Sequence, residues 1–219
     1  GSLAKTGRGH LTDAAVSDAL APCPSQILFD TAATGFKHPN TLDFTAYRGE
    51  SKLGAWRVYS VGGGKIEIEG FPPVAPQTIY PLHTFTGIKA ECAKRGIRLW
   101  QYVESCEGPG IWEYLADVWR QMKATVGKGL AAQGTLPGGL GVRRKARELL
   151  EGESQNDTAE MRESRLVYAY AFAASEENAG GGTIVTAPTC GASGVVPAVM
   201  LFKQEQHGFS DQEILRALA

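Results

Sequence analysis

The chain has 219 residues, of which 43% are hydrophobic and 21% charged, a composition typical of globular proteins with one large or two small domains. Its formal net charge of −1 gives no electrostatic reason to expect nucleic acid or an anionic membrane as a partner. The sequence contains no run of about 18 apolar residues, so no transmembrane helix is expected.

The N-terminal part of the chain is predicted to combine helix and strand. A helix is expected over residues 12–20, with Thr12 as its N-cap and Asp13 in its first turn, where the helix dipole favours an acid. Alternating or β-rich stretches predict four strands, over residues 26–30, 42–47, 55–61 and 65–69. The fold class expected for residues 1–70 is therefore α+β.

A glycine triplet and then four prolines, at positions 72, 73, 76 and 81, interrupt this pattern. Beyond them the apolar spacing changes from a period of two to that of a helix. We therefore expect a domain over residues 1–70, a linker over 71–83 and an all-helical domain over 84–219.

The helical part contains two strong signals. Apolar residues between Ile111 and Val126 fall on one helical face, with Asp117 and Arg120 on the other. Residues 162–174 include LVYAYAFAA, which is apolar on all sides and predicts a helix buried in the middle of a bundle. The glycines at 180–182 are expected to end that helix.

Two histidines are candidates for acid–base chemistry. His10 lies in GRGHLTD, just before an expected helix start, where a histidine can act as a general base. His38 lies in FKHPNTLDF, at a turn made by Pro39 and Asn40. The residues alone favour exposed loop histidines at both positions.

The densest stretch of small polar residues is ENAGGGTIVTAPTCGASG. Thr186, Thr189, Ser193 and the backbone amides of residues 191–194 could bind a carboxylate, and Cys190 could be a nucleophile or a metal ligand. A tight turn between two helices explains the composition equally well. Earlier in the sequence, the basic residues 143–145 could bind an anion, although the first turn of a solvated helix is the favoured interpretation.

The four cysteines form no CxxC pair, which predicts neither a disulfide framework nor a local zinc site. They are expected to be free thiols in a reducing cytosol. We expect Cys23, Cys92 and Cys106 to be structural.

Taken together, these segments resemble the bacterial iron–sulfur-dependent L-serine dehydratases, or L-serine ammonia-lyases. The opening GSLAKTGRGHLTD is similar to the family's YGSL-x-x-TGKGHxTD segment, and YSVGGGKI to its YSIGGG strand. SEENAGGGTIVTAPTCGASGVVPAVM is similar to the core NEENAxGGxVVTAPTxGxxGxxPAVL. The resemblance spans nearly the whole chain.

The resemblance implies a β domain related to serine-binding regulatory domains, of which residues 1–70 would be the C-terminal part. Residues 84–219 would begin a helical catalytic α domain. The implied reaction removes water from L-serine and gives pyruvate and ammonia, with a [4Fe-4S] cluster as the Lewis acid. A cytoplasmic homodimer is the implied context.

The same resemblance assigns site residues. His10 and His38 match the family's catalytic histidines. The substrate- and cluster-binding residues implied by the motifs are Thr12, Asn40, Asn178, Thr186, Thr189, Cys190, Gly191, Ser193 and Gly194. We expect His10 and the turn at 186–194 to face one another across a domain interface.

The chain also departs from the family pattern. The SSSHTxGP motif is absent, and none of the four cysteines matches the family's three cluster ligands, so no metal ligand is expected within this chain. We expect a fragment lacking both ends, with the cluster cysteines beyond Ala219 and without turnover by itself. Two alternatives stay open: a non-catalytic serine-binding regulatory module, and a lyase for cysteine or another β-substituted amino acid.

Overall fold

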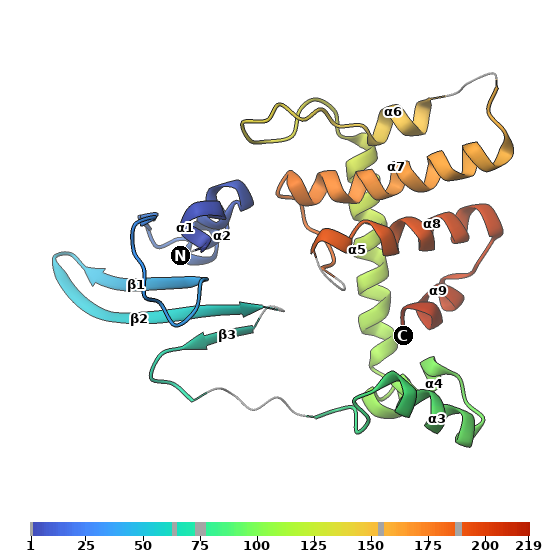
Figure 1. The fold of residues 1–219 in the computed structure, drawn as a ribbon, viewed down its shortest axis with the longest axis horizontal. Helices are drawn as coiled ribbons and strands as arrows, with labels where there is room; N and C mark the ends of the chain where they lie inside the picture. The colour runs from blue at the N-terminus through green and yellow to red at the C-terminus, as the bar shows by residue number, and fades with distance from the viewer. Residues whose placement is uncertain (1, 63–64, 73–77, 153–155, 187–189) are drawn as a thin grey trace. The chain divides into compact units, whose positions relative to one another are not determined.

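The computed structural model describes the chain except for residues 1, 63–64, 73–77, 153–155 and 187–189, and it describes only the backbone of His10 and Cys190. The chain divides into two compact units, Gly1–Pro76 and Gln77–Ala219. The first unit contains a three-stranded sheet with short helices, and the second is mostly helical (Figure 1). The expected order of a mixed region followed by a helical one is confirmed.

The sheet of the first unit is antiparallel, with its strands in the order β1-β2-β3. Its strands are β1 (Thr41–Arg48), β2 (Ser51–Gly62) and β3 (Lys65–Ile68). Pairing of the strands sets Phe44 opposite Trp56 and Val58 opposite Ile68. Three of the four expected strands are confirmed, because apolar and β-branched residues at alternate positions suit a pleated backbone.

Two expectations for the first unit are wrong. Residues 26–30 form no strand: Phe29 packs against the N-terminal helical segment, where Arg8 lies over its ring at 5.1 Å from the centroid. The helices there are α1 (Ser2–Thr6), the 3₁₀ turn η1 (Gly7–His10) and α2 (Thr12–Leu20). Thr12 is the first residue of α2 rather than its N-cap. The cap position belongs to Leu11, which has a left-handed backbone at φ 55° and makes no side-chain cap.

The helices of the second unit start and stop at conventional signals. Thr84 and Thr158 accept the N–H of Gly87 and Met161 at two N-caps, and Ser210 forms a capping box with Glu213. The elements are α3 (Phe85–Arg95), α4 (Leu99–Glu107), α5 (Ile111–Ala131), α6 (Ala146–Glu151), α7 (Ala159–Ala179), η2 (Cys190–Ala192), α8 (Val195–His207) and α9 (Asp211–Leu218). As expected, α7 ends directly before the glycines at 180–182.

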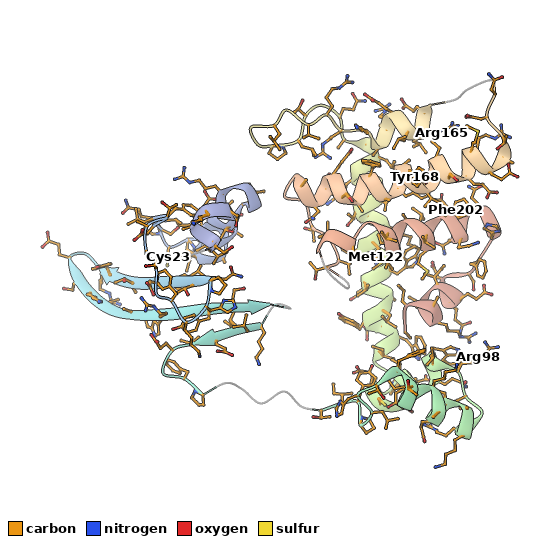
Figure 2. All side chains as sticks on the ribbon, viewed as in Figure 1. Cys23, Arg98, Met122, Arg165, Tyr168 and Phe202 are labelled. Atoms are coloured by element: carbon orange, nitrogen blue, oxygen red, sulfur yellow. The ribbon has the colours of Figure 1, made fainter. Side chains whose placement is uncertain are left out.

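Helix α5 is the element around which α6, α7, α8 and α9 pack (Figure 1). One buried cluster joins Val126 of α5 to Ala173 of α7 and Phe202 of α8. A second joins Trp119 and Met122 of α5 to Ile214 of α9, and Met122 and Phe202 are labelled in Figure 2. The predicted apolar face of α5 is confirmed, because its buried residues recur at helical spacing.

Helix α7 differs from its prediction. Ala169 and Ala173 are fully buried, but Tyr168, labelled in Figure 2, is 59% exposed and Phe172 is 43% exposed, so one face of α7 is left uncovered although α5, α6 and α8 pack against the helix. The sequence shows that the segment is apolar on all sides. It does not show how many other helices pack around it. Within the described residues no helix, α7 included, is long and apolar enough to cross a membrane.

The loop between α5 and α6 breaks the purely helical pattern. An isolated antiparallel bridge pairs Thr135 with Arg143, and the N–H of Arg144 donates to the carbonyl of Gly134 at 2.9 Å. The second unit is therefore mostly, and not entirely, helical. The basic residues at the end of this loop directly precede α6.

Candidate functional site

The N-terminal candidate segment is a chain of short helical turns. The hydroxyl of Thr6 donates to the carbonyl of Ser2 at 3.1 Å, and the N–H of Leu11 donates to the carbonyl of Arg8 at 3.2 Å. Gly7 is buried, and a Cβ there would lie 2.9 Å from the ring of Phe29. The backbone of His10 is thus held on an ordered turn, directly before the left-handed residue Leu11.

His38 is built into the turn that precedes β1. Its Nδ1 accepts the N–H of Asn40 at 3.1 Å, and its carbonyl accepts the hydroxyl of Thr41 at 2.6 Å. The amide of Asn40 in turn donates to the carbonyl of Ser60 at 3.5 Å. A ring nitrogen that accepts a backbone N–H carries no proton, so neutral His38 carries its proton on Nε2. His38 is therefore arranged as a hydrogen-bond donor.

The structure brings these two segments of the first unit together. The N–H of Ser2, at the start of α1, donates to the carbonyl of Pro39 at 2.8 Å. The N-terminal helical segment is thereby joined to the turn of His38 and Asn40. Thr12 is half-buried at the start of α2.

The helical unit holds the other candidate residues at the junction of α7 and α8. Asn178 lies in the last turn of α7, and Thr186 is exposed in the connection that follows. Cys190 and Gly191 belong to the 3₁₀ turn η2, and Ser193 is buried just beyond it. Thr189 lies outside the described residues.

Gly194 packs directly against α7. A Cβ at this position would lie 2.7 Å from the carbonyl oxygen of Ala171 and 2.8 Å from the hydroxyl oxygen of Ser175. No side chain fits there, which explains this glycine by packing between α7 and α8. The tight-turn interpretation is therefore physically justified at Gly194, whether or not the turn also binds a ligand.

The basic residues before α6 are paired with acids. Arg143 donates to Glu148 at 2.5 Å across an exposed surface. Arg144 donates to Glu177 at 3.3 Å, and each side chain of this pair is only 13% exposed. These contacts give both arginines a structural partner, so their geometry does not single out a free anion site.

Glu176 and Glu177 lie near the C-terminal end of α7 and were not among the predicted site residues. Glu176 is 4% exposed, and its Oε1 accepts the backbone N–H groups of Lys145 and Ala146 at 2.6 and 3.3 Å. Its Oε2 is buried and has no hydrogen-bond partner among the residues that the structure describes. Negative charges in the last turn of a helix interact unfavourably with the helix dipole. This unfavourable placement is the sequence feature that could have pointed to the two glutamates.

The cysteines whose side chains are described are free thiols in different settings. Cys23 is exposed in the first unit, Cys92 is buried in α3, and Cys106 is half-buried in α4. Among the described side chains, no three or more histidine, cysteine, aspartate or glutamate residues are grouped as metal ligands. Their structural role stays a prediction.

Comparison with known proteins gives a consistent family. The sequence model of the family described as serine dehydratase alpha chain matches residues 83–219, which include every helix from α3 to α9.

The relatives are L-serine dehydratases. L-serine dehydratase 1 of Escherichia coli (strain K12) is 31% identical over 249 aligned residues, which cover 92% of this chain and 55% of the relative. L-serine dehydratase of Haemophilus influenzae is 30% identical, over 94% of this chain and 56% of the relative. That of Streptomyces coelicolor is 33% identical, over 74% of this chain and 38% of the relative. The chain spans about half the length of the first two relatives.

Proposed function

Because the chain belongs to the serine dehydratase alpha chain family, that of the iron–sulfur L-serine dehydratases, we propose that the protein containing it is an L-serine ammonia-lyase. The observation that carries this proposal is the identity of 31% with an L-serine dehydratase over 92% of the chain. That alignment is too long to lie within the helical unit alone, so the likeness includes residues of both units.

The proposed reaction is a β-elimination. A base takes the proton from Cα of L-serine, the Cβ–O bond breaks, and the hydroxyl leaves as water after gaining a proton. The product, aminoacrylate, tautomerises to an imine, and water hydrolyses the imine to pyruvate and ammonia. Because the Cα proton is weakly acidic and hydroxide leaves poorly, both groups must be handled by well-placed acid–base partners.

The two histidines of the first unit are proposed to divide this work. We assign proton removal to His10, on the evidence of its family motif and its ordered backbone turn. His38, whose Nδ1 already accepts the N–H of Asn40, suits donation of a hydrogen bond from Nε2 to a substrate oxygen. The bond between Ser2 and Pro39 supports a shared site, because it joins the two segments.

The remaining candidate residues are proposed to bind the carboxylate and ammonium groups of L-serine. They are Thr12, Asn40, Asn178, Thr186, Thr189, Cys190, Gly191, Ser193 and Gly194. The family motifs support these assignments, which no contact among the described residues tests.

The iron–sulfur cluster of the family is not matched by the described side chains, since Cys92 and Cys106 lie on separate helices and no metal-ligand group is found among them. We therefore assign no step to a cluster here. We propose that the cluster ligands lie in the rest of the enzyme, since this chain covers 55% of the Escherichia coli relative.

The proposed domain assignment follows the family. Residues 1–70 would belong to the β domain, residues 71–83 to a linker and residues 84–219 to the α domain. A cytoplasmic homodimer is the proposed context of the intact enzyme.

The test uses the intact protein, purified anaerobically and supplied with L-serine. We expect pyruvate, detected by coupled lactate dehydrogenase, and equimolar ammonia. D-serine, L-threonine and L-cysteine serve as competing substrates. Faster turnover of L-cysteine than of L-serine would indicate a related lyase instead. Binding of L-serine without formation of pyruvate would favour a regulatory module.

Two histidine variants test the assigned roles. His10→Ala is expected to lower kcat by at least about 100-fold, as for loss of a general base. His38→Gln can keep a donor near Nε2, whereas His38→Asn cannot, so the Gln variant should retain more activity. Near-normal turnover of His10→Ala, or a better Asn variant, would contradict the assignment.

A further inference from the structure

The connection between α7 and the candidate turn is irregular, yet side chains of α5 hold it. The carbonyl of Thr183 accepts the amide of Gln121 at 3.0 Å and lies 2.9 Å from the hydroxyl of Thr125. The Gln121 amide also donates to the Thr125 hydroxyl at 3.1 Å. The hydroxyl of Thr125 has one proton, and the carbonyl of Gln121 one turn earlier also lies 2.9 Å from it, so the two carbonyls share this donor.

These two donors sit on a rigid support. Thr125 is 2% exposed, and its neighbours Met122 and Val126 are members of the two buried clusters. The register of α5 is therefore fixed by core packing, and a side chain on a fixed helix defines a position more closely than one on a loop.

A second anchor lies at the end of α7. The N–H of Gly182 donates to the carbonyl of Glu177 at 2.8 Å, and the N–H of Gly180 donates to that of Glu176 at 2.8 Å. A Cβ at Gly182 would lie 2.5 Å from Oε2 of Glu177, the acid that pairs with Arg144. The ion pair therefore lies against the glycine backbone.

The far end of the turn is anchored as well, because Gly194 packs on the carbonyl of Ala171 with no room for a side chain. Thr186 follows Thr183 by three residues, and each residue spans at most about 3.6 Å, so the anchor restricts where Thr186 can lie. Side chains of α5 thus restrict Thr186 through Thr183, and packing on α7 fixes Gly194.

We propose that Thr125 and Gln121, together with the Arg144–Glu177 pair, are positioning residues for Thr186 and Gly194, the described ends of the candidate substrate segment. This inference rests on the proposed function. The anchors touch no reacting group and act through Thr183 and the glycines. Because a misplacement of about 1 Å can cost 100-fold in rate, loosening the anchor should reduce catalysis more than stability.

The central test is Thr125→Val in the intact protein, which keeps the shape of the side chain and deletes its hydroxyl. We expect kcat/KM for L-serine to fall by about 10- to 100-fold, with faster hydrogen exchange at the amides of residues 183–186. Thr125→Ser, which keeps the hydroxyl, should restore both.

A stability control comes from the N-cap of α7. Thr158→Ala removes a cap from the same unit and should lower Tm by about 2–4 °C, without changing kcat/KM below that Tm. The positioning role is overturned if Thr158→Ala lowers kcat/KM as much as Thr125→Val does. It is also overturned if kcat/KM of Thr125→Val stays within about twofold of the wild-type value, far less than the expected loss.

The glycine anchor has a matched pair. Gly182→Ala forces a Cβ against the carboxylate of Glu177 and should lower kcat/KM, whereas Gly139→Ala, with nothing within 4 Å of the new Cβ, should not. If the wild-type protein forms no pyruvate, the proposed function fails. The anchoring is then judged by hydrogen exchange alone, and equal exchange at residues 183–186 in wild type and Thr125→Val would overturn it.

Discussion

The two units differ most in their interiors. The helical unit has two buried clusters built on α5, α7, α8 and α9. In the first unit, Tyr59 is the one large hydrophobic side chain that is fully buried among the described residues, whereas Trp56 and Ile66 are exposed. A sheet needs a second layer to bury its apolar face, and the short helices α1 and α2 cover little of this one.

The comparison indicates that the two units are stabilised differently. The helical unit gains stability from packing between helices, so substitutions of its buried residues should lower its free energy of unfolding strongly. The first unit relies on strand pairing and on polar contacts at its surface, such as the Arg57–Asp43 pair at 2.7 Å. Four predictions test this difference.

The largest effect is expected from tryptophan. Trp119→Ala removes a side chain that is 2% exposed and should cost the helical unit about 3–5 kcal/mol. Trp56→Ala removes one that is 44% exposed and should cost much less. Urea unfolding followed by hydrogen exchange, which reports each unit separately, checks both. Equal losses would contradict the comparison.

A glycine pair on α5 should give the next largest effect. A Cβ at Gly129 would lie 2.2 Å from the carbonyl oxygen of Ala173, so Gly129→Ala must separate α5 from α7 and should cost about 3 kcal/mol. Gly127→Ala meets nothing within 4 Å and should stabilise the unit by up to about 1 kcal/mol through helix propensity. The free energies of unfolding of the two variants should therefore change in opposite directions.

Serine-to-alanine changes should give smaller and opposite effects in the two units. Ser210 caps α9, so Ser210→Ala should cost about 1 kcal/mol. Ser17 lies inside α2 and bonds only weakly at the surface, to Ser25 at 3.1 Å, so Ser17→Ala should gain a few tenths, about 0.3 kcal/mol. Thermal unfolding monitored unit by unit gives the comparison, and a stabilising Ser210→Ala would contradict the capping role.

The smallest effect is expected from pH. The pKa of Asp211 is held below its ordinary value of 3.8 by hydrogen bonds from Gln204 first, then Trp119 and Lys123. A carboxyl whose folded pKa is depressed stabilises the fold above its unfolded pKa, and that contribution is lost as pH falls through the folded value. The helical unit should therefore lose stability below about pH 4, and Asp211→Asn should flatten this dependence.

A control for the pH effect exists in the first unit. The pKa of Asp43 is lowered chiefly by its hydrogen bond from Arg57. Asp43→Asn should flatten the acid response of the first unit and leave that of the helical unit unchanged. Denaturation midpoints at pH 7 and pH 3 measure both responses. If the midpoint of Asp211→Asn falls between these pH values as much as that of the wild type, the contacts of Asp211 contribute nothing to stability.

The amino-acid sequence was sufficient to predict the elements whose signals are local. Alternation predicted β3, helical spacing predicted the apolar face of α5, and glycines predicted the end of α7. Each signal depends on the backbone geometry of one segment, which is why it can be interpreted without knowledge of the rest of the chain. The candidate site was located by its family motifs, and its residue roles remain predictions.

What each segment packs against became clear from the three-dimensional structure and not from local sequence patterns. Residues 26–30 have the composition of a strand but form none, and the LVYAYAFAA stretch of α7 is apolar on all sides but leaves Tyr168 and Phe172 exposed on one of them. The donor character of His38 depends on the N–H of Asn40, and the hold on Thr183 depends on side chains 62 and 58 residues away on α5. Such contacts join residues that no local period relates, so packing of the whole unit had to specify them.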